Sequence, residues 1–220
     1  MPHLLSLYNK VAVRLSYIIA FFIVTCQVST LYPYWYSSHV RSVLFVTGNQ
    51  RKLDEARLAC DLYDIEIINQ VFDIDEIQSS NPRQVTEHKA RAAYDLAGRP
   101  VVVTDTCWSI PALGGFPGAY MKDIANWFSE QDFLNLMTDK DDSRISFTEN
   151  IAYYDGKTLQ FFSKELWGQV VPPRGTGNSI ENVAEFEGKT LGERRAEGGV
   201  SHAPEDYVWI DFAKWYANRP

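Results

Sequence analysis

The sequence has little cysteine, and none of it is arranged for pairing. Three cysteines occur in 220 residues, at Cys26, Cys60 and Cys107, and no two of them form a CxxC motif. Disulfide frameworks and zinc sites need even-numbered or closely spaced cysteines, so neither is expected here. The scattered thiols indicate a reducing compartment.

The chain also lacks an excess of basic residues. It contains 21 Lys and Arg against 28 Asp and Glu, which gives a formal net charge of −7. Surfaces that bind nucleic acid broadly are usually basic, so we expect no nucleic-acid partner. A small anionic ligand is still compatible with this balance, because a few local lysines can outweigh the average field.

Long hydrophobic runs are absent as well. The most apolar stretch near the N-terminus is LSYIIAFFIVT, which follows Lys10 and Arg14 and is short for a membrane-spanning helix. Residues 1–40 have three interpretations: a signal-like segment, a weak membrane anchor, or an extension from an early start site with no folded role. We favour the third, and expect membrane contact only if this segment is a genuine anchor. The domain is then predicted at residues 41–220.

The rest of the chain alternates strand-like and helix-like segments, without internal repeats. Strands are predicted at 42–46, 65–68 and 100–103, and helices at 52–60, 82–97 and 133–137. Ser129 and Asp132 have the spacing of a capping box before the third of these helices.

Two further patterns complete the fold prediction. Residues 145–166 predict a β-hairpin, in which Asp155-Gly156 supplies the positive φ angles of a tight turn. A C-terminal amphipathic helix carries Val208, Phe212 and Trp215 on or near one face. Helices, parallel strands and a hairpin together predict an α/β fold with a mixed central sheet flanked by helices.

The segment VTGNQRK, at residues 46–52, joins the first predicted strand to the first predicted helix. Gly48 allows a sharp turn, and Asn49 can cap the helix. A helix N-terminus favours phosphate through its free N–H groups and its dipole. Lys52 lies in the first turn, where a cation opposes the dipole unless an anion lies beside it. The segment is therefore either an ordinary capped helix with a solvated lysine or a phosphate-binding loop.

Acidic residues stand at two later places. Asp73, Asp75 and Glu76 form a short cluster that is either a solvated loop or a site bridged by a cation such as Mg²⁺. Asp105 is expected directly after a buried strand, where α/β folds place ligand chemistry, although it could simply cap the following turn. A glycine-rich loop and Lys122 come shortly after it.

Taken in order, these motifs resemble one family. TGNxxK, DxDEIQ, a helix with Lys89, VTDTxW, LGGFPGxYxK and a late VSH resemble the inosine triphosphate pyrophosphatases over residues 43–202. The resemblance implies hydrolysis of a non-standard purine nucleoside triphosphate to the monophosphate and pyrophosphate, with Mg²⁺ as cofactor. It also implies an elongated, twisted sheet, two lobes with a nucleotide cleft between them, and a homodimer.

The resemblance assigns roles residue by residue. Glu76 and Asp105 fall on the positions that hold the metal or activate water, and we expect Asp105 to act on the water. The positions that bind the substrate are Thr47, Gly48, Asn49, Lys52, Lys89, Thr106, Lys122, Glu181, Ser201 and His202.

The region that would contact the base departs from the family pattern. Relatives have an aromatic segment after the PRG motif, whereas this chain has NSIE at 178–181, which keeps a carboxylate in Glu181 but has no ring. A lysine of relatives aligns with Glu197, unless Arg194 or Arg195 replaces it through a local shift. The arginine of the family's Ser-His-Arg is Ala203 here.

These departures remove donors and positive charge from the base site, and Glu197 would add an acceptor. They predict altered base selectivity, toward an amino-bearing or otherwise modified nucleotide. Two alternatives stay open: a homologue that binds nucleotide but has lost turnover, and a related pyrophosphatase that prefers pyrimidine or modified bases. Because nucleoside triphosphates are abundant in the cytosol, we expect a cytoplasmic enzyme.

Overall fold

The computed structural model describes residues 41–118, 120–198 and 207–219. The predictions made for residues 1–40, and for Ser201 and His202, lie outside the described residues. None of the helices in the described part is long and apolar enough to cross a membrane.

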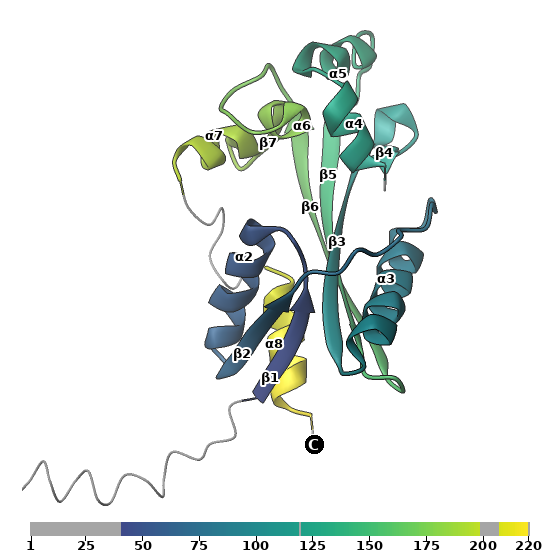
Figure 1. The fold of residues 1–220 in the computed structure, drawn as a ribbon. Coiled ribbons are helices and arrows are strands. Elements are labelled where there is room, and N and C mark those ends of the chain that lie inside the picture. Colours follow the sequence, from purple (N-terminus) through teal and green to yellow (C-terminus); the bar gives the residue numbers. More distant parts are fainter. Residues whose placement is uncertain (1–40, 119, 199–206, 220) are drawn as a thin grey trace, which may run out of the picture. The chain divides into compact units, whose positions relative to one another are not determined.

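An eight-stranded mixed sheet forms the centre of the described part (Figure 1), in the order β2-β1-β3-β5-β6-β7-β8, with β4 paired to β3. β1 is parallel to β2 and to β3, and the remaining described pairings are antiparallel. The strands are β1 Arg41–Val46, β2 Ile65–Gln70, β3 Val101–Ile110, β4 Phe116–Gly118, β5 Arg144–Tyr154, β6 Leu159–Val170, β7 Ala184–Phe186 and β8 Lys189–Thr190. The predicted α/β class with a mixed sheet is confirmed.

Five of the α-helices in the described part begin at a side-chain cap, whereas α4 and α8 do not. Asn49 and Asn81 accept hydrogen bonds from the first turns of α2 and α3, and Ser129 and Asp132 form the predicted capping box at α5. The helices are α2 Gln50–Asp61, α3 Pro82–Ala97, α4 Met121–Trp127, α5 Glu130–Leu136, α6 Ser179–Val183, α7 Leu191–Ala196 and α8 Trp209–Ala217, with a 3₁₀ turn at Pro111–Leu113.

The third strand is longer than its sequence pattern predicts. β3 runs to Ile110, so the prediction that Asp105 follows the strand is wrong. The antiparallel pairing of β3 with β5 continues from Val101 to Ser109, whereas its parallel pairing with β1 covers only Val101 and Val102. Asp105 therefore lies inside β3 but beyond the point where β1 ends, so the edge of the parallel part is open beside it.

The hairpin is present, but its turn differs from the prediction. Four residues join β5 to β6, and only Gly156 of the predicted pair has a positive φ, at 89°. Asp155 instead closes the turn with its side chain, which accepts hydrogen bonds from the backbone N–H groups of Lys157 and Thr158 at 3.0 and 2.7 Å. This is the turn chemistry that Asp offers when its own backbone is not left-handed.

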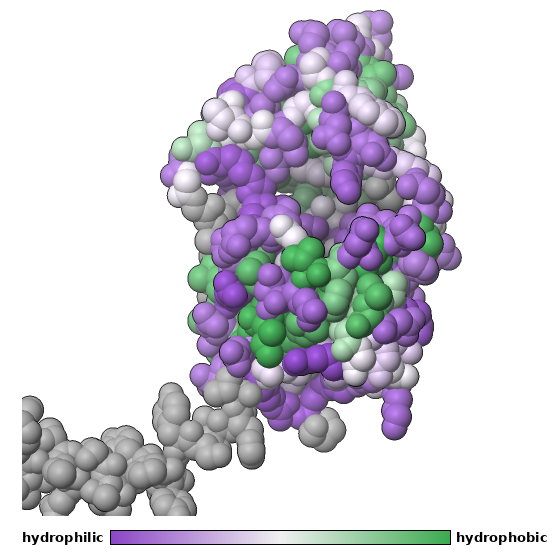
Figure 2. Space-filling model, in the orientation of Figure 1, coloured by the Kyte–Doolittle hydropathy of each residue, from purple (hydrophilic) through white to green (hydrophobic). Residues whose placement is uncertain are grey.

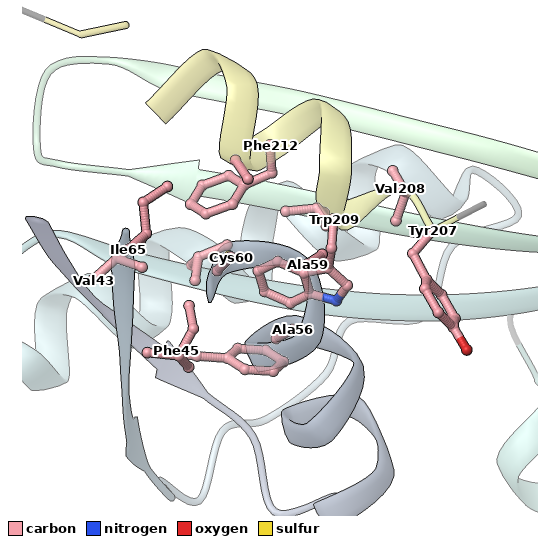
Figure 3. Packing of buried hydrophobic residues seen from close by; sticks show 14 of the residues in the cluster. Val43, Phe45, Ala56, Ala59, Cys60, Ile65, Tyr207, Val208, Trp209 and Phe212 are labelled. Atoms are coloured by element: carbon pink, nitrogen blue, oxygen red, sulfur yellow. The ribbon is translucent and has the colours of Figure 1, made fainter. Parts of the chain in front are cut away.

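Three hydrophobic clusters cover the sheet. One lies between the sheet and helices α2 and α8, where Trp209 and Phe212 lie against Phe45 and Cys60 (Figure 3) and the rings of Phe45 and Trp209 are 4.8 Å apart. A second contains Ala90 and Ala93 of α3 with residues of β1, β3 and β5. The third gathers at the other end of β3 and β5, among α4, α5, α6 and α7. The long strands thus join two packed regions, with α2 and α3 at one end and the short helices at the other.

Candidate active site

A pocket of about 850 Å³ lies where these two packed regions meet. Its walls come from α2, α3, β3, α4, β5, α6, α7 and the segment before α3, and the surface around it is rich in hydrophilic residues (Figure 2). Of the predicted site residues, those that line it are Asn49, Lys52, Glu76, Lys89, Asp105, Thr106, Lys122 and Glu181. Thr47 and Gly48 do not line it, and Ser201 and His202 are outside the described residues.

Thr47 and Gly48 do not line the pocket but shape the turn into α2. The Thr47 hydroxyl accepts a hydrogen bond from the Asn49 backbone N–H at 3.1 Å, and the Asn49 side chain accepts one from the Lys52 backbone N–H at 3.4 Å. Thr47 therefore orients the cap, and the cap orients the helix start. Gly48 forms the turn itself, with only Val71 near the position of a side chain.

Lysines and carboxylates from four elements meet at one end of the pocket. The Lys89 ammonium of α3 lies 2.6 Å from the Glu76 carboxylate, and Lys52 of α2 and Lys122 of α4 line the same end. Burial alone would raise the pKa of Glu76, but the hydrogen bond from Lys89 and the charges of the lysines lower it below its usual value. Glu76 is therefore ionised at neutral pH.

Lys52 and Asp105 shift each other's pKa in the buried part of this end of the pocket. Burial lowers the pKa of the Lys52 ammonium, and the opposite charge of Asp105 partly offsets that effect. Burial raises the pKa of Asp105, against the attraction of Lys52 and Lys89. A carboxylate with a raised pKa in a cleft has the property expected of a proton acceptor.

Glu76 and Asp105 are also the residues that could hold a metal ion. Within the described ranges no cluster of three or more His, Cys, Asp or Glu is arranged to hold one. Mg²⁺ is commonly bound by one or two carboxylates together with substrate phosphates, so two carboxylates beside a phosphate-sized space fit this ion. The predicted acidic cluster contributes only Glu76, because Asp73 and Asp75 are exposed and line no part of the pocket.

The other end of the pocket contains two arginines: Arg195, which the sequence offered as a replacement for the relatives' lysine, and Arg51, which the sequence analysis missed. The Arg51 guanidinium of α2 lies 2.7 Å from the Glu55 carboxylate, and the Arg195 guanidinium of α7 lies 2.7 Å from the Glu181 carboxylate. Phe147 lines the same pocket. The i,i+4 spacing of Arg51 and Glu55 was a signal for their ion pair, but nothing in it shows that the pair faces a pocket.

Glu197, a candidate for the base region, lies elsewhere. Glu197 is exposed and lies 2.6 Å from the Lys189 ammonium, so it does not line the pocket, and the acceptor that it was expected to add is absent there. Arg174 forms ion pairs with Glu185 and Glu193 and does not line the pocket either. Of the residues named as replacements for the missing lysine, Arg195 is the one at the pocket wall.

A small cavity of about 30 Å³ adjoins this end, sharing Arg51, Glu55, Phe147 and Arg195 with the main pocket. Its wall includes Glu149 of β5, which is only 6% exposed. Burial and the neighbouring charge of Glu55 raise the pKa of Glu149 to about 7, against the attraction of Lys52 and Arg51. The cavity is about the size of one water molecule.

Comparison with solved structures identifies the same fold. A HAM1 protein from Coxiella burnetii superposes with a TM-score of 0.69 at 20% identity, over 81% of this chain and all of that one. The Ham1 protein of Staphylococcus aureus gives a TM-score of 0.65 at 19% identity, over 81% of this chain and all of that one. At these sequence identities, the similarity establishes the fold alone.

Comparison of sequences adds the family. The chain is 36% identical over 155 residues to an inosine triphosphate pyrophosphatase from Fusarium vanettenii, which covers 69% of this chain and 83% of that relative. It is 32% identical over 182 residues to the inosine triphosphate pyrophosphatase of Neurospora crassa, which covers 80% of this chain and 93% of that relative. A dITP/XTP pyrophosphatase from Methanopyrus kandleri is 29% identical over 182 residues, which cover 80% of this chain and 97% of that relative. The profile of the Ham1 family matches residues 43–195, so the chain belongs to the Ham1 family.

Proposed function

We propose that this protein hydrolyses a nucleoside triphosphate to the monophosphate and pyrophosphate. The observation that carries the proposal is the division of the pocket into two ends. One end has Lys52, Lys89 and Lys122 beside two carboxylates, which suits a triphosphate, and the other has arginines and Phe147, which suit a base. A volume of about 850 Å³ is within the range of pockets that hold small-molecule ligands.

In the proposed reaction, water attacks the α-phosphorus, the bond to the β-phosphate oxygen breaks, and pyrophosphate leaves. Asp105 accepts the proton of the water, a role supported by its raised pKa and its place on the pocket wall. Lys52, Lys89 and Lys122 neutralise charge on the phosphate oxygens as it develops. Asn49 and the free N–H groups at the start of α2 face the phosphate chain.

Mg²⁺ would be held by Glu76 and Asp105 together with phosphate oxygens. When bound, it would supply positive charge that stabilises the phosphate oxygens and the leaving group. Glu76 is kept ionised by Lys89 and is thus ready to bind a cation. Removal of divalent ions with EDTA is expected to abolish turnover, and Mg²⁺ is expected to restore it.

Pyrophosphate release tests the proposal directly. The full chain is incubated with Mg²⁺ and, separately, with inosine, xanthosine, adenosine, guanosine and pyrimidine triphosphates. Release from at least one purine triphosphate is expected, and absence of release from all of them would overturn the proposal. Release mainly from pyrimidine triphosphates would favour a related pyrophosphatase of different base preference.

The Asp105→Asn variant tests the assigned proton acceptor. It is expected to lower kcat about 10²- to 10⁴-fold, because the amide cannot take the proton. Asp73→Asn is the matched control, since Asp73 is exposed on the neighbouring acidic loop and does not line the pocket. Undiminished turnover of Asp105→Asn would remove Asp105 from this role.

A second candidate function is a homologue that binds nucleotide without turning it over. It is favoured by one observation: residues 179–183 form the short helix α6, and this segment supplies no aromatic ring to the pocket. Binding of a triphosphate without pyrophosphate release would support this candidate. The presence of both carboxylates and all three lysines at the other end supports turnover instead.

We also propose that base selectivity is altered relative to the relatives, because different side chains line the base end. The expectation of an amine-bearing base no longer has Glu197 to support it. A cytoplasmic location, a homodimer and a domain that begins near Arg41 are proposed as well. Fractionation, sedimentation and removal of residues 1–40 test these three statements separately.

A further inference from the structure

A buried carboxyl that the proposed reaction does not use lies beside the pocket. Glu149 of β5 is 6% exposed and lines the small cavity of about 30 Å³, which shares wall residues from α2, β5 and α7 with the pocket. In the ladder between β3 and β5 its partner is Thr106, whereas Asp105 is paired with Asn150. Because neighbouring residues of a strand alternate, Glu149 and Asp105 point to opposite faces of the sheet, and Glu149 is not placed to share a metal ion with Asp105.

Charged and titratable groups face Glu149 from several neighbouring elements. Lys164 of β6 is its partner in the ladder between β5 and β6 and lines the same cavity. The groups that line this cavity or act on the charge of Glu149 are Arg51, Lys52 and Glu55 of α2, Lys164 of β6, Arg195 of α7, and Tyr207, which precedes α8.

The cations that favour ionised Glu149 belong to the pocket as well. Lys52 and Arg51 attract the Glu149 carboxylate, and both line the pocket. A negatively charged ligand in the pocket would therefore compete with Glu149 for the same two positive charges. Glu149 is in this way electrically connected to the pocket without lining it.

A second buried carboxylate in the same cavity opposes the ionisation of Glu149. Glu55 is only 2% exposed and lies 2.7 Å from the Arg51 guanidinium, so this arginine is already paired. Burial and the charge of Glu55 raise the pKa of Glu149 to about 7, so both of its forms are populated near neutral pH. The cavity is about the size of one water molecule and adjoins the pocket, which gives a proton a short way to the carboxyl.

We propose that Glu149 is a proton-binding site linked to substrate binding: it takes up a proton from the solvent when a triphosphate enters the pocket and returns it when the pocket empties. This inference rests on the proposed function, which supplies the triphosphate. The negative charges of the ligand repel the Glu149 carboxylate and engage Lys52. Because such coupling is reciprocal, the triphosphate is expected to bind more weakly once Glu149 is ionised.

Calorimetric titration of the full chain tests the proposal. The ligand is inosine triphosphate with a methylene group in place of the oxygen between the α- and β-phosphorus, so that pyrophosphate cannot leave, and Mg²⁺ is present. Titrations in buffers of different ionisation heat count the protons taken up, and at pH 7 the wild type is expected to take up more than Glu149→Gln. Between pH 6 and pH 8 the Kd of the wild type is expected to rise about three- to tenfold more than that of Glu149→Gln.

Three further variants make the test specific. Glu149→Leu also cannot ionise, so it separates loss of the proton from loss of hydrogen bonds. Glu149→Asp keeps an ionisable carboxyl and is expected to retain the proton uptake. Glu165→Gln removes an exposed carboxylate that faces the other side of the sheet and lines neither the pocket nor the small cavity, and it is expected to behave as the wild type. Unfolding temperatures show that each variant is folded.

Equal proton uptake and an equal pH dependence of Kd in the wild type, Glu149→Gln and Glu149→Leu would overturn the inference. So would a change of Kd by the same factor at every pH, because that is the effect of a purely structural role. Pyrophosphate release is measured separately with the cleavable triphosphates, and if it persists the proposed function stands in both cases. Absence of release from every triphosphate would instead overturn the proposed function, while the titrations would still decide the inference.

Discussion

Interactions between single charged residues hold the side chains of the pocket wall in place before any ligand binds. Lys52 opposes the dipole of α2, and its position in the sequence suggests that an anion must lie beside it. In the structure that anion is Asp105, whose charge attracts Lys52 from β3. Asp105 thus offsets only part of the cost of burying the Lys52 ammonium, whose pKa stays lowered, so a further anion beside Lys52 would stabilise its charge.

Glu149 gives a residue-scale prediction about stability and pH. Its pKa is raised from 4.5 to about 7, chiefly by burial. The neutral carboxyl therefore favours the folded state at pH values below the unfolded pKa, and this contribution is lost as the pH rises through the folded value. Glu149→Gln cannot ionise, so its stability relative to wild type is expected to rise by about 2 to 3 kcal/mol between pH 5 and pH 8.

Urea unfolding of both proteins at several pH values measures this difference. Glu66→Gln serves as the control, because Glu66 is an exposed residue of β2, and its difference from wild type is expected to stay flat. A flat difference for Glu149→Gln as well would show that Glu149 does not change its charge on unfolding over this range.

At the scale of elements, the start of α2 combines a structural and a functional role. Asn49 caps the helix and also lines the pocket. Asp caps as well as Asn, so Asn49→Asp is expected to retain stability. It also places a negative charge at the phosphate end, so KM for a triphosphate is expected to rise about tenfold.

The same replacement at another helix provides the control. Asn81 caps α3 and does not line this pocket, so Asn81→Asp is expected to change neither stability nor KM. Loss of stability in Asn49→Asp, or an unchanged KM, would contradict the dual role of Asn49. Asn49→Ala is expected to cost about 1 kcal/mol of stability through loss of the cap.

The contact between the loop before α6 and the start of α7 sets the position of Arg195. Gly175 has φ of 89°, and a Cβ added there would collide with the backbone of Gly192 and Glu193. Gly188 has a similar φ of 81° but open space around it. Gly188→Ala is expected to cost about 1 to 2 kcal/mol from backbone strain alone, and Gly175→Ala at least about 1 to 3 kcal/mol more.

Denaturant unfolding compares the two glycine variants. Both variants carry the same backbone strain. The difference between their free energies of unfolding therefore isolates the collision of the loop with α7. Equal destabilisation would mean that α7 moves away freely from the added side chain.

At the scale of the whole molecule, the first residues of the described domain are bonded to its last helix. The Arg41 guanidinium donates to the Tyr216 carbonyl at 2.8 Å, and the Tyr216 hydroxyl donates to the Ser42 carbonyl at 2.8 Å. The first strand and the last helix are thereby tied together. Removal of residues 1–40 is expected to leave the unfolding temperature and kcat/KM unchanged.

Circular dichroism melting and pyrophosphate release on the shortened protein measure this. A control truncation that also removes β1, beginning at Gly48, is expected to prevent folding, since β1 is the strand between β2 and β3. An insoluble or inactive protein beginning at Arg41 would show that the N-terminal segment contributes to the domain.

The sequence by itself determined several of the elements and several residues of the pocket wall, whereas α4, α6, α7, β4, β7 and β8 were not predicted from it. Helix caps, glycine turns and apolar periodicity act over a few residues, so α2, α3, α5 and the hairpin were predictable from local patterns. Lys52, Lys89, Asp105 and Lys122 were found for a related reason, because each belongs to a short motif whose residues lie next to one another in the chain.

Only the tertiary structure decided which side chains of α7 line the pocket. Whether Arg195 or Glu197 faces the pocket depends on how α7 packs on α6 and on the close approach at Gly192, and no local pattern encodes that contact. The length of β3, and hence the place of Asp105, depends on pairing with β5, which lies about forty residues away in the chain. Contacts between distant segments fix these positions, so side chains two residues apart in sequence come to serve different surfaces.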